Sequence, residues 1–305
     1  MIRTLNDVGR LAKEKGPKKL AVLAPEDGEF MEAIKKSQQM GYIEPVLIGN
    51  QETMQRVADE VEFDISNVEK IFETDRQSIA NLGTAMLFAG DVDMSSKGQI
   101  PTSFIYRSII KEESRAGTGR TISVITLWEI PELDHFMAFT DTGANIHPDY
   151  KAKVAVLKNA VFLFHVLGYA RPRISALSSQ REIGGSLASH EDGRSLQKAA
   201  ASGKLGECEI IEATSFFEFF VGKGRQLADY GEIDIKKLPE ILLVPSLDTG
   251  NILCKLDFFL NVSRRSLVMT SKGPALIPSR ADFCNSIMGE IAMGVVVADR
   301  IKGVI

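Results

Sequence analysis

The chain has 305 residues, of which 44% are hydrophobic and 25% charged, and its formal net charge at pH 7 is -4. The composition is typical of a soluble globular protein, and the length allows two domains of ordinary size. An acidic chain is a poor match for non-specific nucleic-acid binding. Because no apolar run reaches bilayer length and the amino terminus is too polar for a signal peptide, we expect a cytoplasmic protein without nucleic-acid or membrane partners.

The three cysteines, Cys208, Cys254 and Cys284, are far apart and odd in number. This spacing favours free thiols in a reducing compartment. The four histidines show no metal-ligand spacing, so we expect no metal site.

The first half of the chain alternates short apolar runs with helical patterns. Apolar runs predict strands at residues 19–24, 45–48, 121–127 and 136–139, and helical spacing predicts helices at 29–40, 51–60, 76–89 and 102–113. Residues 90–98 are expected to form a solvated loop, in which Lys97 and Gly98 could also meet an anion. The alternation predicts a parallel sheet covered by helices.

The second half repeats this alternation. A long apolar helix is expected at 148–167, with Pro148 at its first position. Further strands are predicted at 174–177, 209–212, 241–244, 266–270 and 275–277, and further helices at 195–201, 252–260 and 283–301.

The segment Leu276–Asp282 reads as a buried strand that ends just before the last helix. Ser279 and Asp282 are residue types that cap helices, and a helix start favours anions. Arg280 could add a bidentate clamp, so a hydroxyl, a guanidinium and a helix N-terminus form a candidate phosphate site. The alternative is an ordinary capped helix beside a surface arginine, since such junctions are common in α/β proteins.

Four apolar runs are followed by similar polar residues, at 140–143, 178–179, 246–251 and 279–280. Ligands of open parallel sheets bind outside the carboxyl ends of strands, so hydroxyls, glycines and an arginine there suit a phosphorylated ligand. Loop ends are generally polar, which is the competing explanation. The sequence has no Walker A motif and no GxSxG elbow, which disfavours a P-loop hydrolase and an α/β-hydrolase.

These residues resemble the phosphate acetyl/butyryltransferase family from about residue 19 to residue 300. The most specific pieces are Pro245–Lys255 (PSLDTGNILCK) and Pro274–Asp282 (PALIPSRAD), and the supporting pieces are Lys97-Gly98 with Thr102, the segment 140–149, and 176–178. The segment with Lys97, and Ser279-Arg280 with Asp282, resemble the butyryl branch more than the acetyl branch.

The resemblance implies an enzyme that moves a short-chain acyl group between coenzyme A and inorganic phosphate: acyl-CoA and phosphate give acyl phosphate and coenzyme A. It also implies a homodimer with no cofactor, coenzyme A being a substrate. The implied fold is two three-layer α/β/α domains with mostly parallel sheets, isocitrate-dehydrogenase-like, with the active-site cleft between them. The domains would be residues 1–145 with 267–305, and residues 146–266.

The resemblance also assigns site residues. Arg280 and Ser279 would bind phosphate and stabilise the transition state, while Asn251 and Lys255 would hydrogen-bond phosphate or the thioester carbonyl. Asp282 is the nearest carboxylate that could take a proton from the coenzyme A thiol. The residues expected to bind phosphate or coenzyme A are Lys97, Gly98, Thr102, Thr140, Asp141, Ser178, Gly250 and Pro278.

Two departures from the family pattern leave an alternative open. Ser286 stands about where the acetyl branch has an aspartate, and the segment 211–216 lacks the Gly-Pro-Leu of the butyryl branch. The alternative is therefore a non-catalytic or divergent relative that binds coenzyme A or a phosphorylated ligand. A dehydrogenase of the same fold would need clustered metal-binding aspartates, which the sequence lacks. Phe216, Phe217, Phe219 and Phe220 could line an acyl pocket or belong to the core.

Overall fold

The computed structural model describes residues 1–179, 187–212, 214–221 and 235–303. The chain forms two compact units. The N-terminal unit comprises Leu5–Ile122 and Arg265–Ile305, and the central unit comprises Met1–Thr4 and Ser123–Arg264. The C-terminal segment of the chain thus belongs to the same unit as the N-terminal part. The domain limits at residues 145 and 267 stay a prediction.

In the N-terminal unit, the strands follow the order β3–β2–β1–β4–β11–β10. Their bounds are β1 Lys18–Leu23, β2 Ile43–Gly49, β3 Glu69–Phe72, β4 Met94–Lys97, β10 Ser263–Met269 and β11 Pro274–Leu276. All neighbours with a recorded register run parallel except β10 and β11, which are antiparallel. The carboxyl ends of β1, β2, β4 and β11 therefore meet at one edge.

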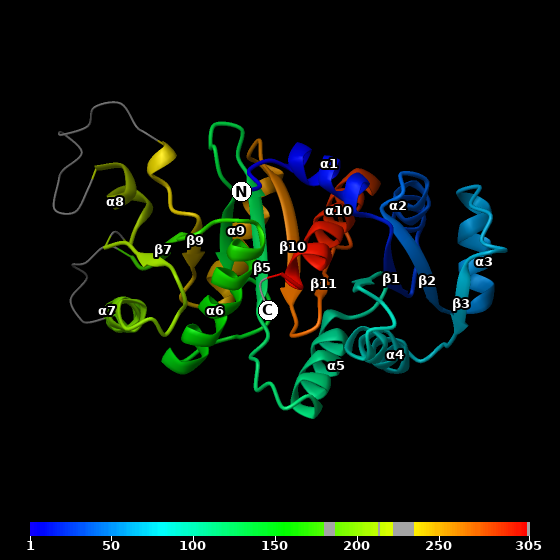
Figure 1. The fold of residues 1–305 in the computed structure, drawn as a ribbon, viewed down its shortest axis with the longest axis horizontal. Coiled ribbons are helices and arrows are strands. Elements are labelled where there is room, and N and C mark those ends of the chain that lie inside the picture. Colours follow the sequence, from blue (N-terminus) through cyan, green and yellow to red (C-terminus); the bar gives the residue numbers. More distant parts are fainter. Residues whose placement is uncertain (180–186, 213, 222–234, 304–305) are drawn as a thin grey trace. The chain divides into compact units, whose positions relative to one another are not determined.

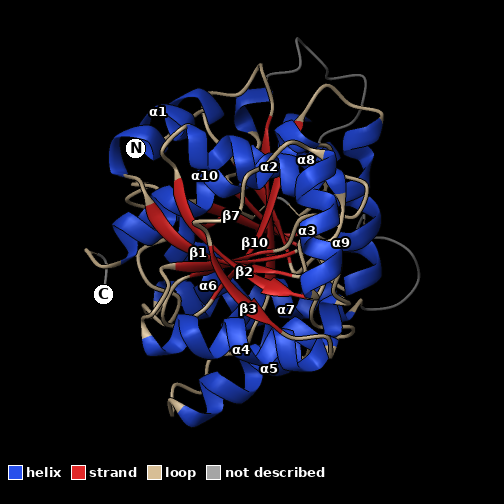
Figure 2. Cartoon of the chain, turned by 90° about the vertical axis from the view of Figure 1, so that its right-hand side faces the viewer, coloured by secondary structure: helices blue, strands red, loops and turns tan. Residues whose placement is uncertain are grey.

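Helices cover both faces of these strands. One layer contains α1 (Leu5–Lys15), α2 (Gly28–Gln39), α3 (Gln51–Glu60) and α10 (Cys284–Ile301), and the other contains α4 (Arg76–Ala89) and α5 (Thr102–Arg115) (Figure 1). Figure 2 shows strands β1, β2 and β3 between these layers. Helix α10 is apolar almost all round because it packs against α1, α2 and β11.

In the central unit, the strands follow the order β5–β6–β9–β7–β8. Their bounds are β5 Val124–Glu129, β6 Met137–Thr140, β7 Arg173–Ala176, β8 Glu209–Ile210 and β9 Ile241–Leu243. β5 and β6 are antiparallel, and the remaining neighbours run parallel. The helices are α6 Tyr150–Val166, α7 Ala188–Ala201, α8 Phe216–Val221 and α9 Leu247–Cys254, with short 3₁₀ segments at 235–237 and 255–258. The expected α/β class with mostly parallel strands is confirmed.

An aromatic cluster fills part of the central unit. Trp128 meets Phe139 edge-on at a centroid distance of 4.9 Å, and Phe219 from α8 joins them in the buried cluster. Phe219 is therefore a core residue, whereas Phe216 is 39% exposed. The side chains of Phe217 and Phe220 lie outside the described residues.

Several local predictions were wrong, including the start of α7, which begins at Ala188 instead of residue 195. Residues 94–97 form strand β4 instead of part of a loop, because Ser95 and Ser96 lie buried between β1 and β11. Helix α9 begins at Leu247, five positions before the predicted start at residue 252, since Ser246 caps it. Pro148 precedes α6, whose N-cap is Asp149, with its carboxylate accepting from the Ala152 N–H at 2.8 Å.

Candidate active site

A hollow in the N-terminal unit brings together six of the predicted site residues. Its lining includes Lys97, Gly98, Pro278, Ser279, Arg280 and Asp282. They meet because β4 and β11 are parallel neighbours, with Leu276 beside Ser96, so both chains leave the sheet at the same edge. Thr102, the first residue of α5, is half-buried and is not part of this lining.

Lys97 is the last residue of β4 and is only 5% exposed. Its Nζ donates a hydrogen bond to the carbonyl oxygen of Gly98 at 3.4 Å. Burial lowers the pKa of Lys97, because it penalises the ammonium form, and the Arg280 guanidinium lowers it further. The Glu290 carboxylate raises the pKa of Lys97, but by less than burial lowers it. The expectation of an exposed lysine in a solvated turn was therefore wrong.

Gly98 brings two backbone segments into close approach. Its N–H donates to the carbonyl oxygen of Leu23 at 2.7 Å, at the end of β1. A Cβ at residue 98 would lie 2.3 Å from the carbonyl oxygen of Ala24. Only glycine fits without moving the end of β1, so this residue keeps Lys97 next to the β1 turn.

The turn after β11 presents Arg280 to solvent. The N–H of Ser279 donates to Oδ2 of Asp282 at 2.7 Å, and the N–H of Ala281 donates to Oγ of Ser279 at 3.3 Å. Arg280 is exposed, and its guanidinium has no hydrogen-bond or ion-pair partner among the residues that the structure describes. This turn places the Arg280 guanidinium at the rim of the hollow.

The start of α10 differs from the prediction. Phe283 is its N-cap residue and makes no side-chain cap. Instead, the N–H of Cys284 donates to Oε2 of Glu29 in α2 at 2.6 Å. The Asp282 carboxylate accepts from the Ser279 N–H in the preceding turn, so neither Asp282 nor Ser279 caps the start of α10. A carboxylate of the chain already occupies part of the anion-favouring helix start.

Three side chains of this region, Asp27, Gln99 and Glu290, were not predicted from the sequence. Asp27 and Gln99 also line the hollow, and Nε2 of Gln99 donates to Oδ2 of Asp27 at 2.9 Å. Asp27 is the N-cap of α2, a position that the sequence Asp-Gly-Glu after an apolar run indicates. Glu290 of α10 is 2% exposed, and its Oε1 accepts from the Ile277 N–H at 3.0 Å.

A second group of predicted residues gathers in the central unit. The backbone after β6 lies against the start of α9, where a Cβ at Gly250 would be 2.6 Å from the carbonyl oxygen of Asp141. Nδ2 of Asn251 donates to the carbonyl oxygen of Thr142 at 3.4 Å. Glycine at 250 thus permits the close approach of the start of α9 to the backbone after β6.

Asp141 organises the turn that follows β6 and is 2% exposed. Its Oδ1 accepts from the N–H groups of Val124 (2.9 Å), Gly143 (2.9 Å) and Ala144 (3.0 Å). Its Oδ2 accepts from the N–H of Asn145 at 2.8 Å and from Nδ2 of the same residue at 2.5 Å. Both oxygens of the carboxylate therefore accept hydrogen bonds from the protein itself, which compensates for the burial of the group.

The other predicted residues of the central unit differ in exposure. Thr140 is fully buried, and its Oγ1 donates to the carbonyl oxygen of Val124 at 3.4 Å. Ser178 follows β7, with its Oγ 2.6 Å from Oγ of Ser189. Lys255 follows α9 and is exposed. Because β6, β7 and β9 run parallel, their carboxyl ends share one edge, which accounts for three of the four polar strand ends.

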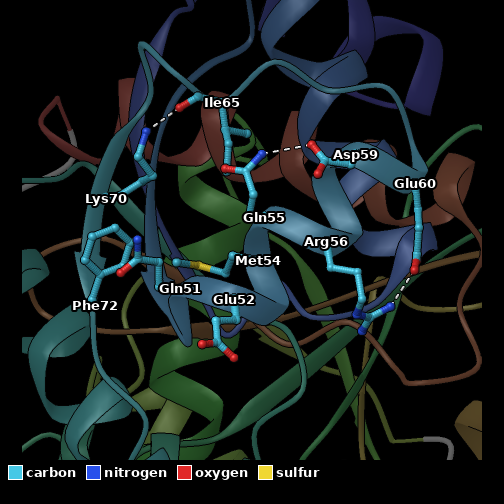
Figure 3. A pocket seen from close by; sticks show the side chains of 10 residues that line it. All are labelled: Gln51, Glu52, Met54, Gln55, Arg56, Asp59, Glu60, Ile65, Lys70 and Phe72. Atoms are coloured by element: carbon cyan, nitrogen blue, oxygen red, sulfur yellow. Dashed lines mark hydrogen bonds and ion pairs between the residues drawn. The ribbon is translucent and has the colours of Figure 1, made fainter.

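A larger hollow lies between α3 and β3, away from these residues (Figure 3). Several of its polar groups bind one another: Arg56 pairs with Glu60 at 2.5 Å, and Gln55 donates to Asp59 at 2.9 Å. Lys70 donates to the backbone carbonyl oxygens of Ile65, Ser66 and Val68. These groups are already satisfied, so the smaller hollow beside Lys97 is the better candidate for chemistry.

The fold defines an α/β protein in which hydroxyl, amide and basic side chains follow the carboxyl ends of several strands. A family model described as "Phosphate acetyl/butaryl transferase" matches residues 72–294. The chain belongs to this phosphate acetyl/butyryltransferase family.

Individual relatives agree with this assignment. A phosphate butyryltransferase from Clostridium acetobutylicum is 25% identical over 301 residues, which is 98% of this chain and 99% of the relative. A phosphate acetyltransferase from Thermotoga maritima is 25% identical and covers 96% of this chain and 99% of its own length.

The solved structure of a branched-chain phosphotransacylase from Enterococcus faecalis V583 is 18% identical, with a TM-score of 0.72, and covers 92% of this chain and 100% of its own. The likeness to solved structures confirms the expected isocitrate-dehydrogenase-like fold. Among the described residues, no helix has both the length and the apolar character needed to cross a membrane.

Proposed function

We propose that this protein is an acyltransferase that moves a short-chain acyl group between coenzyme A and inorganic phosphate. The observation that carries the proposal is the meeting of buried Lys97 and exposed Arg280 in one hollow, at the ends of adjacent parallel strands. The Arg280 guanidinium, the Lys97 amine and the Ser279 hydroxyl form a site suited to a phosphate dianion. Family membership connects such a site with acyl transfer.

The chemistry follows from positioning and charge. Phosphate held by Arg280 and Lys97 would place an oxygen against the thioester carbonyl, and this fixed geometry supplies much of the rate. The positive charges of Arg280 and of protonated Lys97 would stabilise the negative charge of the tetrahedral transition state. Asn251 and Lys255 remain our candidates for contacts with the carbonyl or with coenzyme A, and Asp282 for proton transfer.

We also propose that the protein is a homodimer that associates through α9 and the segment following it. Four large apolar side chains are exposed there: Ile252 (66%), Phe258 (62%), Phe259 (86%) and Leu260 (50%). Contiguous exposed apolar residues of this kind mark protein interfaces. A second copy of the chain is the partner that the family resemblance implies.

The test is release of free thiol from acetyl-, propionyl- and butyryl-CoA, each with and without inorganic phosphate. Phosphate-dependent release from at least one of them supports the proposal, and the relative rates rank the acyl groups. The absence of release with all three would contradict it and favour the alternative, a relative that binds coenzyme A or a phosphorylated ligand without this transfer.

A further inference from the structure

Acyl transfer from coenzyme A to phosphate requires a proton to move, and two side chains of the hollow compete for this role. Hydrogen phosphate carries a proton that acyl phosphate lacks, and the leaving thiolate of coenzyme A must gain one. The sequence resemblance favours Asp282. In the structure, Oδ2 of Asp282 accepts from the Ser279 N–H at 2.7 Å, which commits that oxygen to the turn.

Within the described residues, Lys97, unlike Asp282, has no strong hydrogen bond that ties its side chain to a turn. Its side chain is 5% exposed and ends in the same hollow as Ser279 and Arg280. In the described part of the chain, no carboxylate oxygen lies within 4.0 Å of Nζ, and the hydrogen bond to Gly98 is long, at 3.4 Å. The amine is thus desolvated, weakly bound and directed at the candidate phosphate site.

We propose that Lys97 is a catalytic residue that carries the proton from phosphate to the sulfur of coenzyme A. The inference rests on the proposed acyl transfer. The free amine of Lys97 takes the proton of hydrogen phosphate while a phosphate oxygen bonds to the thioester carbon. The carbon–sulfur bond then breaks, and the thiolate takes that proton from the Lys97 ammonium. Acyl phosphate and the coenzyme A thiol leave, and the amine is restored.

The surroundings of Lys97 favour loss of its proton compared with an exposed lysine. Burial and the Arg280 guanidinium lower the pKa of Lys97 from its usual value. The carboxylates of Glu290 on α10, Asp282 after β11 and Asp27 after β1 raise it, but they do not cancel the effect of burial. A lysine of this kind can act as a general base, which an exposed lysine does poorly.

The decisive variant is Lys97→Arg, because arginine keeps the positive charge but does not release its proton. We expect kcat to fall by about 100-fold, the usual scale of general acid–base catalysis, while the KM for phosphate changes by less than about threefold. Lys272→Arg, at an exposed lysine of the same unit, is the matched control and should behave as the wild type. Asp282→Asn is measured in parallel.

A Lys97→Arg enzyme with wild-type kcat would overturn the inference, as would a loss confined to the KM for phosphate. Loss of kcat in Asp282→Asn with a normal Lys97→Arg enzyme would assign the proton to Asp282 instead. These outcomes leave the proposed function intact if the wild type is active. A wild-type chain without phosphate-dependent thiol release would reject the function and the inference together.

A second measurement covers the case in which arginine disrupts folding. Lys97→Ala, checked by circular dichroism and thermal unfolding, is assayed with added methylamine or tetramethylammonium. We expect methylamine to restore activity in proportion to its free-base concentration, and tetramethylammonium to restore none, because it has no proton to transfer. Equal rescue by both cations, or by neither, would show that Lys97 does not transfer the proton.

Discussion

The backbone N–H of Cys284 donates a hydrogen bond to Oε2 of Glu29 at 2.6 Å, which joins the start of α10 to α2. Glu29 thus supplies the cap that Phe283 cannot provide. The partial positive charge of the helix start is partly offset by a residue of the chain itself. Phosphate binding in this region is therefore expected to depend chiefly on the side chains of Arg280 and Lys97.

Glu29→Gln should lower the free energy of unfolding by about 0.5–1 kcal/mol, because a charged acceptor at the start of α10 is lost. Urea unfolding followed by circular dichroism measures this change. The matched control is Glu32→Gln on the same helix. The Glu32 carboxylate is partly exposed and pairs with Lys35 and Lys36 within α2, and these ion pairs should contribute less. Equal losses for both variants would mean that the cap has no special role.

Gly250→Ala should reduce both stability and activity, because the new Cβ would lie 2.6 Å from the carbonyl oxygen of Asp141 and 2.9 Å from Cγ2 of Val244. Moving the start of α9 away from the strand ends is expected to cost about 1–3 kcal/mol. Thermal unfolding and the thiol-release assay follow the two effects.

Gly193→Ala is the control for this glycine. Gly193 lies inside α7, and its added Cβ would meet Ala176 at an ordinary 3.7 Å. Alanine should therefore stabilise the protein slightly, by up to about 1 kcal/mol. A Gly250→Ala variant as stable as Gly193→Ala would contradict the close approach at α9.

Asp141→Asn should destabilise the central unit by about 2–3 kcal/mol, because an amide replaces a carboxylate that accepts several backbone N–H groups. We expect this loss whether or not substrates are present, measured by urea unfolding. Asp149→Asn, at the N-cap of α6, should change stability by less than about 0.5 kcal/mol, since asparagine caps equally well. A stable Asp141→Asn protein with impaired substrate binding would instead favour direct contact with a ligand.

Phe259→Glu should convert the proposed homodimer into monomers, because it places a charge at a side chain that is 86% exposed in the single chain. Sedimentation velocity at several protein concentrations measures the mass. Phe72→Glu is the control, at a phenylalanine that is 52% exposed on β3, and it should leave the dimer intact. A wild-type chain that sediments as a monomer would reject the proposed interface.

Much of the fold could be predicted from the sequence because its strands are continuous apolar runs. Helices α3 and α4 have the predicted bounds, and the parallel neighbours follow from the alternation of strands and helices. Helix α1 and strand β3 were missed because few of their residues are apolar. In α1, for example, Val8 and Ala12 are the buried residues.

The candidate site was only partly predictable. The motif with Ser279 and Arg280 indicated an anion site, but local sequence does not reveal that Glu29 caps α10 from another helix. Lys97 was expected in a solvated loop because lysine is usually exposed. Its burial depends on β4 lying between β1 and β11, which is long-range pairing that no local pattern reveals.

The central claim is that Arg280 binds the phosphate that accepts the acyl group. The most direct test is phosphate-dependent thiol release from butyryl-CoA by the wild type, by Arg280→Ala and by Arg107→Ala. Arg107 is an exposed arginine on α5, stacked on Phe104 at 5.4 Å. We predict a loss of about 100-fold or more in kcat/KM for Arg280→Ala, from the removal of a charged donor, and wild-type release for Arg107→Ala. Unchanged release by Arg280→Ala would contradict the account.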